Sequence, residues 1–226
     1  MKKLLIATVV AAISSVAIAA DLKPYIEGQL GWSNLKDVQS DTYSTSFDGG
    51  TASGSFKTEY DSSISGGFEL GIKNIGIENL RLGASYQTMQ FDMEKVTGTG
   101  TIAGTGENIL LNGTTTGDIT SDVRSVGINL DNRVNLYMAN AYYDFKNSSP
   151  FTPFIGLGIG MADIKNAKDN EFAWSTSLGG KYNVTSNVYL GVKAAYTNVN
   201  GITDKLGIQY EDHKVYSGHA LLGYEF

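Results

Sequence analysis

Apolar and polar residues alternate along most of the chain with a period of two. In residues 25–32, for example, Ile26 and Leu30 fall on one face, whereas Glu27 and Gln29 fall on the other. Such alternation is typical of a β-strand with one apolar and one polar side. The pattern recurs in eight segments, which are residues 25–32, 63–73, 80–86, 137–145, 154–162, 172–183, 188–196 and 214–226. The sequence therefore predicts eight strands.

The connections between these strands alternate in length. The short ones are residues 74–79, 146–150 and 184–187, and the longer ones are residues 34–60, 94–133, 163–171 and 198–213. Short turns on one rim and long loops on the other are typical of an outer-membrane barrel. The two longest segments are rich in Gly, Ser and Thr, so we expect them to be mobile, solvated surface.

Aromatic residues gather near the ends of the apolar faces. Rings with a polar edge favour the headgroup region of a bilayer. The predicted aromatic girdle comprises Trp32, Tyr86, Tyr137, Tyr143, Phe145, Trp174, Tyr182, Tyr196, Tyr216 and Tyr224. A soluble sandwich also alternates apolar and polar residues, but it gives no reason for such a girdle.

Charged residues fall on the opposite faces, interspersed with glycine. The predicted interior cluster comprises Glu27, Glu69, Lys73, Arg81, Asp144, Lys181, Lys193 and Glu225. Because Arg or Lys facing lipid near the midplane costs about 2–4 kcal/mol, this side must face the lumen. The predicted fold is an all-β, transmembrane, eight-stranded antiparallel up-and-down β-barrel. An interior of that size is filled by side chains, so we expect no continuous water channel.

The N-terminus has the pattern of a secretory signal peptide. Lys2 and Lys3 precede an apolar run, and Ala17 and Ala19 form an A-x-A-like cleavage site. We therefore expect a signal peptide at residues 1–19 and a barrel domain at residues 20–226. An uncleaved anchor helix is the alternative, but the apolar run is short for a span of about 20 residues.

Composition and charge exclude several classes of function. The 226 residues contain no Cys, so neither a disulfide framework nor a thiolate metal site is possible. The formal net charge of −6 argues against a nucleic-acid partner. We predict no cofactor, no metal site and no catalytic residues.

Three groups of residues are candidates for a chemical role. Ser217 and His219 share the inward face of the last strand with Glu225, whereas a lipid-hydrolysing site would need them at the bilayer rim. His213 lies at a loop end, where we expect it to be solvated. Acidic residues between 163 and 171 lack the spacing of a calcium loop.

One stretch carries a family resemblance. Residues 137–145 read Tyr-Met-Ala-Asn-Ala-Tyr-Tyr-Asp-Phe, and residues 151–160 read Phe-Thr-Pro-Phe-Ile-Gly-Leu-Gly-Ile-Gly. This stretch resembles the N-x-Y-Y-D and T-P-Y/F-x-G-x-G-x-G motifs of the opacity-protein and rickettsial surface-antigen family of small Gram-negative outer-membrane barrels. Tyr224 and Phe226 resemble that family's assembly signal, although Leu221 stands where a glycine is often found.

The resemblance implies a fold and a location in the outer membrane after Sec-type export, but no single activity. The expected partners are outer-membrane lipids, periplasmic chaperones and the barrel-assembly machinery, with an unknown extracellular ligand. Our main hypothesis is a structural or surface-recognition protein, adhesin-like or antigen-like, that acts through its long loops. A narrow porin-like channel and a membrane-embedded lipid-modifying enzyme remain the alternatives.

Overall fold

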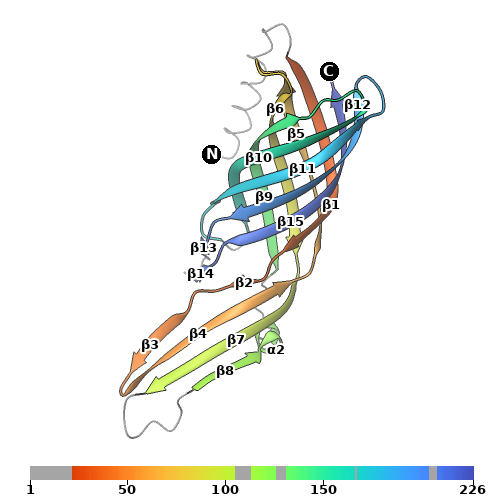
Figure 1. The fold of residues 1–226 in the computed structure, drawn as a ribbon. Helices are drawn as coiled ribbons and strands as arrows, with labels where there is room; N and C mark the ends of the chain where they lie inside the picture. The colour runs from red at the N-terminus through yellow and green to blue at the C-terminus, as the bar shows by residue number, and fades with distance from the viewer. Residues whose placement is uncertain (1–21, 105–112, 126–130, 166, 204–207) are drawn as a thin grey trace.

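Eight antiparallel strands close into a barrel, as the sequence predicts (Figure 1). The computed structural model describes residues 22–104, 113–125, 131–165, 167–203 and 208–226; the expected signal peptide lies outside them. The barrel strands are β1 (Lys23–Leu35), β5 (Ser63–Lys73), β6 (Leu80–Phe91), β9 (Asn132–Asp144), β10 (Phe151–Ile164), β11 (Glu171–Asn183), β12 (Val188–Val199) and β15 (His213–Glu225). Each is at least as long as the 9–11 residues that a tilted strand needs to cross a membrane.

The strand order around the barrel is β1-β15-β12-β11-β10-β9-β6-β5. Strands that follow one another in the barrel are neighbours, so the topology is up-and-down. The three short connections and the start of β1 lie at one end of the barrel (Figure 1). Because short turns are typical of the periplasmic rim of an outer-membrane barrel, we call this the periplasmic end. In the β5–β6 turn, Asn74, Gly76 and Asn79 have φ values of 60°, 67° and 70°. Glycine and asparagine tolerate this left-handed region best, which suits them to a tight turn.

The two longest connections form a second sheet beyond the other end of the barrel (Figure 1). We call this the extracellular sheet. Its strands are β2 (Val38–Gln39), β3 (Tyr43–Phe47), β4 (Gly50–Tyr60), β7 (Met93–Gly104) and β8 (Gly113–Asp118), and the short helix α2 (Thr120–Ser125) follows β8. The expectation of mobile loops is therefore wrong for these strands. The expected solvation holds for β3 and β8, which are exposed along their whole length.

Pairing between the two connections explains the extracellular sheet. β4 comes from the first connection and β7 from the second, and they pair from Gly50 opposite Gly104 down to Tyr60 opposite Met93. Each segment thereby satisfies the main-chain hydrogen bonds of the other. Threonine side chains add cross-strand contacts, since the Thr99 and Thr116 hydroxyls lie 3.1 Å apart.

A short hairpin from the β12–β15 connection holds the extracellular sheet at its base. It consists of β13 (Ile202–Thr203) and β14 (Gln209–Tyr210). Tyr210 forms an isolated bridge with Ser40, and its ring lies 5.7 Å from that of Phe56 in an edge-on contact. Nearby, burial raises the pKa of Tyr60 to about 12, so its hydroxyl stays neutral.

Apolar side chains fill the extracellular end of the barrel. This apolar plug consists of Leu35, Val38, Met89, Phe91, Val134, Leu136, Met138, Ala162, Ile164, Ala173, Val199, Ile202 and Val215. Phe91 and Val134 are completely buried. In the described part of the chain, none of the helical segments has the length and hydropathy of a membrane span.

Candidate functional site: the barrel interior and its surroundings

Arg81 occupies the centre of the periplasmic half of the barrel interior. Its side chain is 1% exposed, and its Nε lies 3.4 Å from Asp144 while an Nη lies 3.8 Å from Glu27. The guanidinium also lies 4.3 Å above the centre of the Tyr142 ring and 5.1 Å from that of Tyr25. Two carboxylates therefore oppose the charge of Arg81, and its guanidinium packs against aromatic faces, although within the described residues its Nε and both Nη atoms have no hydrogen-bond partner.

Glu69 is the second buried centre of charge. The Tyr25 hydroxyl donates a hydrogen bond to Oε1 of Glu69 at 2.5 Å, and the Tyr142 hydroxyl donates one to Oε2 at 2.7 Å. The amide of Asn140 adds a third donor at 2.8 Å. Both carboxylate oxygens thus have partners, so Glu69 can be buried without a cation in direct contact.

Ion pairs continue from Arg81 toward the periplasmic mouth. Lys181 donates to Asp144 at 2.7 Å, and both side chains are buried. Lys73 and Glu225 pair at 2.6 Å, but their side chains are 16% and 18% exposed. The charges are therefore most deeply buried around Arg81 and become wetter at the mouth.

A polar layer separates this charged cluster from the apolar plug. Lys193 donates to Gln29 at 2.5 Å, and within the described ranges it has no carboxylate within 4.0 Å. His219 contacts Ser65 at 2.9 Å and Gln87 at 3.1 Å through Nε2. Along the barrel axis, the interior therefore changes from paired charges, through a hydrogen-bonded polar layer that contains Lys193, to apolar side chains.

The structure places all eight residues of the predicted interior cluster on the inward face. Six of them, Glu27, Glu69, Arg81, Asp144, Lys181 and Lys193, are buried. Lys73 and Glu225 form the pair at the periplasmic mouth. Each residue therefore has the inward orientation that its strand phase indicates.

Sequence reasoning missed the interior aromatic residues. Tyr25, Tyr142, Tyr189 and Phe154 are all at most 4% exposed. The sequence contains the information needed to place them, because each lies between two lipid-facing residues and therefore on the same side of its strand as the charged residues. The interior glycines make room mainly for these rings.

Gly83 shows why the interior needs glycine. A Cβ at this position would lie 2.6 Å from Oε1 of Glu69 and 2.7 Å from the Tyr25 hydroxyl. Any side chain there would displace the tyrosine that binds Glu69. The glycine on β6 is thus part of the charged cluster although it has no side chain.

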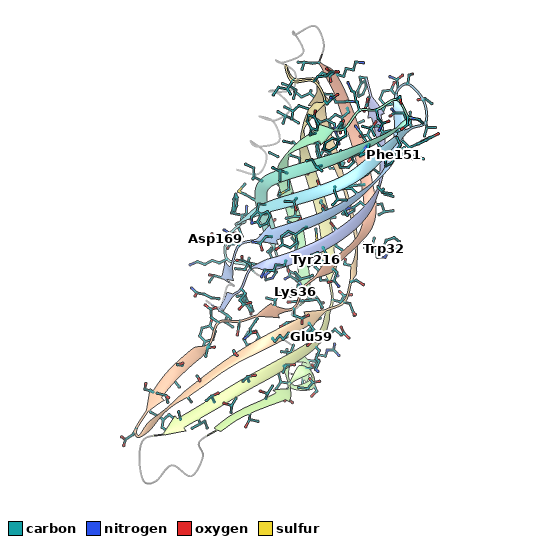
Figure 2. The ribbon with its side chains drawn as sticks, in the orientation of Figure 1. Trp32, Lys36, Glu59, Phe151, Asp169 and Tyr216 are labelled. Carbon is teal, nitrogen blue, oxygen red and sulfur yellow. The ribbon has the colours of Figure 1, made fainter. Side chains whose placement is uncertain are left out.

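The predicted aromatic girdle divides into two rings on the outer surface. Toward the extracellular sheet lie Trp32, Tyr86, Tyr137, Trp174, Tyr196 and Tyr216, and at the periplasmic end lie Tyr143, Phe145, Tyr182 and Tyr224. Figure 2 labels Trp32 and Tyr216 at the extracellular end of the barrel. Neighbouring rings touch, since Tyr196 and Tyr216 are 5.2 Å apart. In the predicted assembly signal, the ring of Tyr224 lies 4.9 Å from that of Phe226.

The candidate chemical groups do not assemble into a site. His219 contacts Ser65 and Gln87, whereas Glu225 pairs with Lys73. The expectation that His213 is solvated is wrong: it is 3% exposed, because β15 begins earlier than predicted and turns this residue inward. Within the described ranges, no three His, Asp or Glu side chains are grouped closely enough to hold a metal ion.

The chain is similar to known outer membrane proteins in sequence and in fold. The model of a family described as outer membrane protein beta-barrel domain matches residues 4–226. The chain is 36% identical to outer membrane protein PagN of Salmonella typhimurium (strain LT2) over 96 residues, which cover 34% of this chain and 40% of PagN. The match thus spans less than half the length of that relative.

A solved barrel has a similar fold. The crystal structure of Neisserial surface protein A matches with a TM-score of 0.54 and 14% sequence identity, over 90% of this chain and 97% of that one. At this level of identity, the likeness concerns the fold alone.

The charged cluster predicts a large effect of removing its cation. Arg81→Met would leave the carboxylates around it buried without their cation, so we expect the free energy of unfolding to fall by about 3–5 kcal/mol. The control is Lys146→Met, which removes the cation of the exposed pair with Glu78, and for which we expect a loss of about 1 kcal/mol or less. Urea unfolding in phospholipid vesicles, followed by tryptophan fluorescence, measures both. Equal losses would contradict the central role of Arg81.

Proposed function

Because the chain belongs to the outer membrane protein β-barrel domain family, we propose that it is a surface-recognition protein whose barrel anchors a preformed binding sheet. The protein resides in the outer membrane of a Gram-negative bacterium, where outer-membrane lipids surround its apolar band. The extracellular sheet stands beyond the barrel and is the part best placed to meet another surface (Figure 1).

The organisation of the extracellular sheet is the observation that carries this proposal. A binding segment that is already ordered loses less conformational entropy on association than a flexible one. The sheet is ordered by β4–β7 pairing and by threonine contacts such as that of Thr101 with Thr114 at 2.9 Å. Its exposed β3 and β8 offer hydroxyls and main-chain groups, which suit polar recognition of a macromolecular surface.

Biogenesis forms the second part of the proposal. We propose that residues 1–19 direct Sec-type export and are removed, and that periplasmic chaperones deliver the chain to the barrel-assembly machinery. Tyr224 and Phe226 support recognition there, because both side chains are exposed at the end of the last strand, at 42% and 68%.

The barrel interior favours a scaffold over a channel or an enzyme. The apolar plug fills one end, and the Arg81 cluster fills the other. For the enzyme alternative, a nucleophile, a base and an acid would have to meet. His219 instead contacts Ser65, and Glu225 pairs with Lys73, so these two side chains do not interact with each other. We therefore propose a non-catalytic role.

Removing the distal part of the extracellular sheet tests the recognition role. Residues 44–53 and 98–117 are each replaced by Asn-Gly, which favours a two-residue hairpin turn. The new turns join Tyr43 to Gly54 and Thr97 to Asp118, residues that already face each other across strands. We expect the trimmed protein to retain heat-modifiable barrel folding and to lose at least tenfold in binding to target cells.

The readout is binding of the labelled, refolded protein to cells, with the full chain measured beside the trimmed one. Folding is checked separately by the electrophoretic shift between unheated and boiled samples. Unchanged cell binding would place recognition outside the sheet. Failure of the trimmed chain to fold would show that the barrel is not an independent scaffold.

Planar-bilayer recording tests the filled interior. We expect the refolded full chain to give no steady unitary conductance, because ionic and apolar side chains occupy both halves of the interior. The trimmed protein serves as the control for the extracellular sheet and should be equally silent. Reproducible conductance steps from either protein would support the channel alternative instead.

A further inference from the structure

Two lysines lie side by side on the outer surface of the barrel at its extracellular end. Lys36 directly follows β1, and its main-chain N–H donates to the carbonyl of Lys214 in β15 at 2.9 Å. Both residues have the outward phase of Trp32 and Tyr216. Figure 2 labels Lys36 between Tyr216 and the extracellular sheet. Both side chains therefore leave the main chain on the outer surface, at the rim where the aromatic ring meets the headgroup region.

The acidic residues near these lysines have other partners. Asp37 pairs with Lys57 at 2.5 Å, and Asp212 accepts a hydrogen bond from Asn198 at 3.1 Å. Across the part of the chain that the structure describes, no carboxylate lies within 4.0 Å of the Lys36 or Lys214 ammonium group. The lysine pair is thus available to an anion from outside the chain.

A groove begins between Trp32 and Tyr216, one outward row away from the lysine pair, and runs obliquely over the lipid-facing surface. Its volume is about 890 Å³. Each wall is a row of outward side chains from residues that lie opposite one another on adjacent strands. The second row is two residues farther along each strand than the first. The first row begins with Trp32, Gly218, Ala194 and Leu178, and the second includes Tyr216 and Tyr196. The groove therefore lies between two rows of outward side chains.

Small residues give this groove its depth at the extracellular end. Gly218 lies between Trp32 on β1 and Ala194 on β12. A Cβ at Gly218 would meet nothing within 4 Å, so the space above the main chain is open. The contacting rings of Tyr196 and Tyr216 form a firm border on the other side.

We propose that this groove and the lysine pair bind lipopolysaccharide, the phosphorylated glycolipid of the outer leaflet. One acyl chain lies between Trp32 and Tyr216 over Gly218, and a phosphate group contacts Lys36 and Lys214. The spacing fits an acyl chain in the groove and a phosphate group on the lysines. Lys214 is two residues from Tyr216, which is about 7 Å along the strand, so the lysines lie just beyond the aromatic ring. Cationic side chains at headgroup depth attract anionic lipid groups, and the apolar groove excludes the headgroup itself.

Two variants each remove one half of the proposed site. Lys36→Gln with Lys214→Gln removes both positive charges, and Gly218→Leu fills the groove where the structure has open space. Each has a matched control. Arg133→Gln with Lys165→Gln removes two charges from a second pair of neighbouring basic residues, at the ends of β9 and β10 on the opposite side of the barrel, where Arg133 also donates to Gln90.

The control for the groove variant is Gly28→Leu. Gly28 is also an exposed, lipid-facing glycine, and a Cβ there would only reach the Leu222 carbonyl at 3.9 Å. It lies outside the groove. Both glycine variants should therefore fold, and heat modifiability checks that every variant does.

Native mass spectrometry of the refolded proteins, titrated with lipid A in detergent, measures the affinity. We expect one tightly held lipid A, with binding about tenfold weaker in the lysine variant, as expected when two surface charges are lost, and similarly weaker in Gly218→Leu. The two controls should stay within twofold of the unaltered protein. Phosphatidylglycerol, measured in parallel, should bind more weakly than lipid A.

Three results would overturn the proposal. Equal lipid A affinity in all variants would mean that no such site exists. An equal loss in the Arg133 and Lys165 control would mean that the rim attracts anions without a defined site. Phosphatidylglycerol binding as tight as lipid A binding, with the same sensitivity to both variants, would assign the groove to phospholipid.

Discussion

The structure depends on one constraint: inside a bilayer, every main-chain N–H and C=O must find its partner within the protein. A closed ring of strands satisfies this condition because it has no edge, and β1 pairs with both β5 and β15 to complete the ring. Closure then fixes where each side chain points, since alternate residues face lipid or lumen. The interior charges, the aromatic rings and the lipid-facing groove all follow from that alternation.

Enclosing charges in a narrow barrel creates a second problem, which the interior solves with aromatic residues. Arg81 has two carboxylates near it, yet its guanidinium also packs on the ring of Tyr142. The same tyrosine donates its hydroxyl to Glu69. Tyrosine thus supplies a π-face to a cation and a hydrogen bond to an anion, which lets opposite charges share the narrow interior. In the proposed function, this packed interior supports the sheet outside the barrel.

The strand phases could be predicted from the sequence because the membrane enforces them. Placing Lys193 or Glu69 on the lipid face would cost free energy. The apolar residues on either side of each then have to face lipid, which sets the orientation of the whole strand. The number of strands, the closed barrel and the inward orientation of the charged residues follow from this single rule. The contacts among the interior residues could not be predicted, because strand phase fixes the face but not the height at which strands pair.

The extracellular sheet was missed for a different reason. The Gly, Ser and Thr content of residues 94–133 favours a solvated loop. The order of these residues favours a strand, because Thr97, Thr99 and Thr101 are each separated from the next by a single glycine. The partner of this segment is β4, about 45 residues earlier in the chain, and nothing local identifies that pairing. The burial of His213 could not be predicted for a similar reason, since β15 begins at this residue, one position before the predicted start of the strand. Strand ends outside the bilayer lack the membrane's constraint and depend on long-range contacts.

The most direct test of this account is the orientation of side chains relative to lipid. The chain has no natural Cys, so Leu157→Cys and Ser175→Cys can each carry a single nitroxide label, one on a lipid-facing position and one on an inward-facing position of adjacent strands. In proteoliposomes, we expect dissolved oxygen to relax the label at position 157 strongly and the label at position 175 weakly, since oxygen concentrates in hydrocarbon. Equal relaxation at both positions, or stronger relaxation at position 175, would contradict the closed barrel with its charges inside.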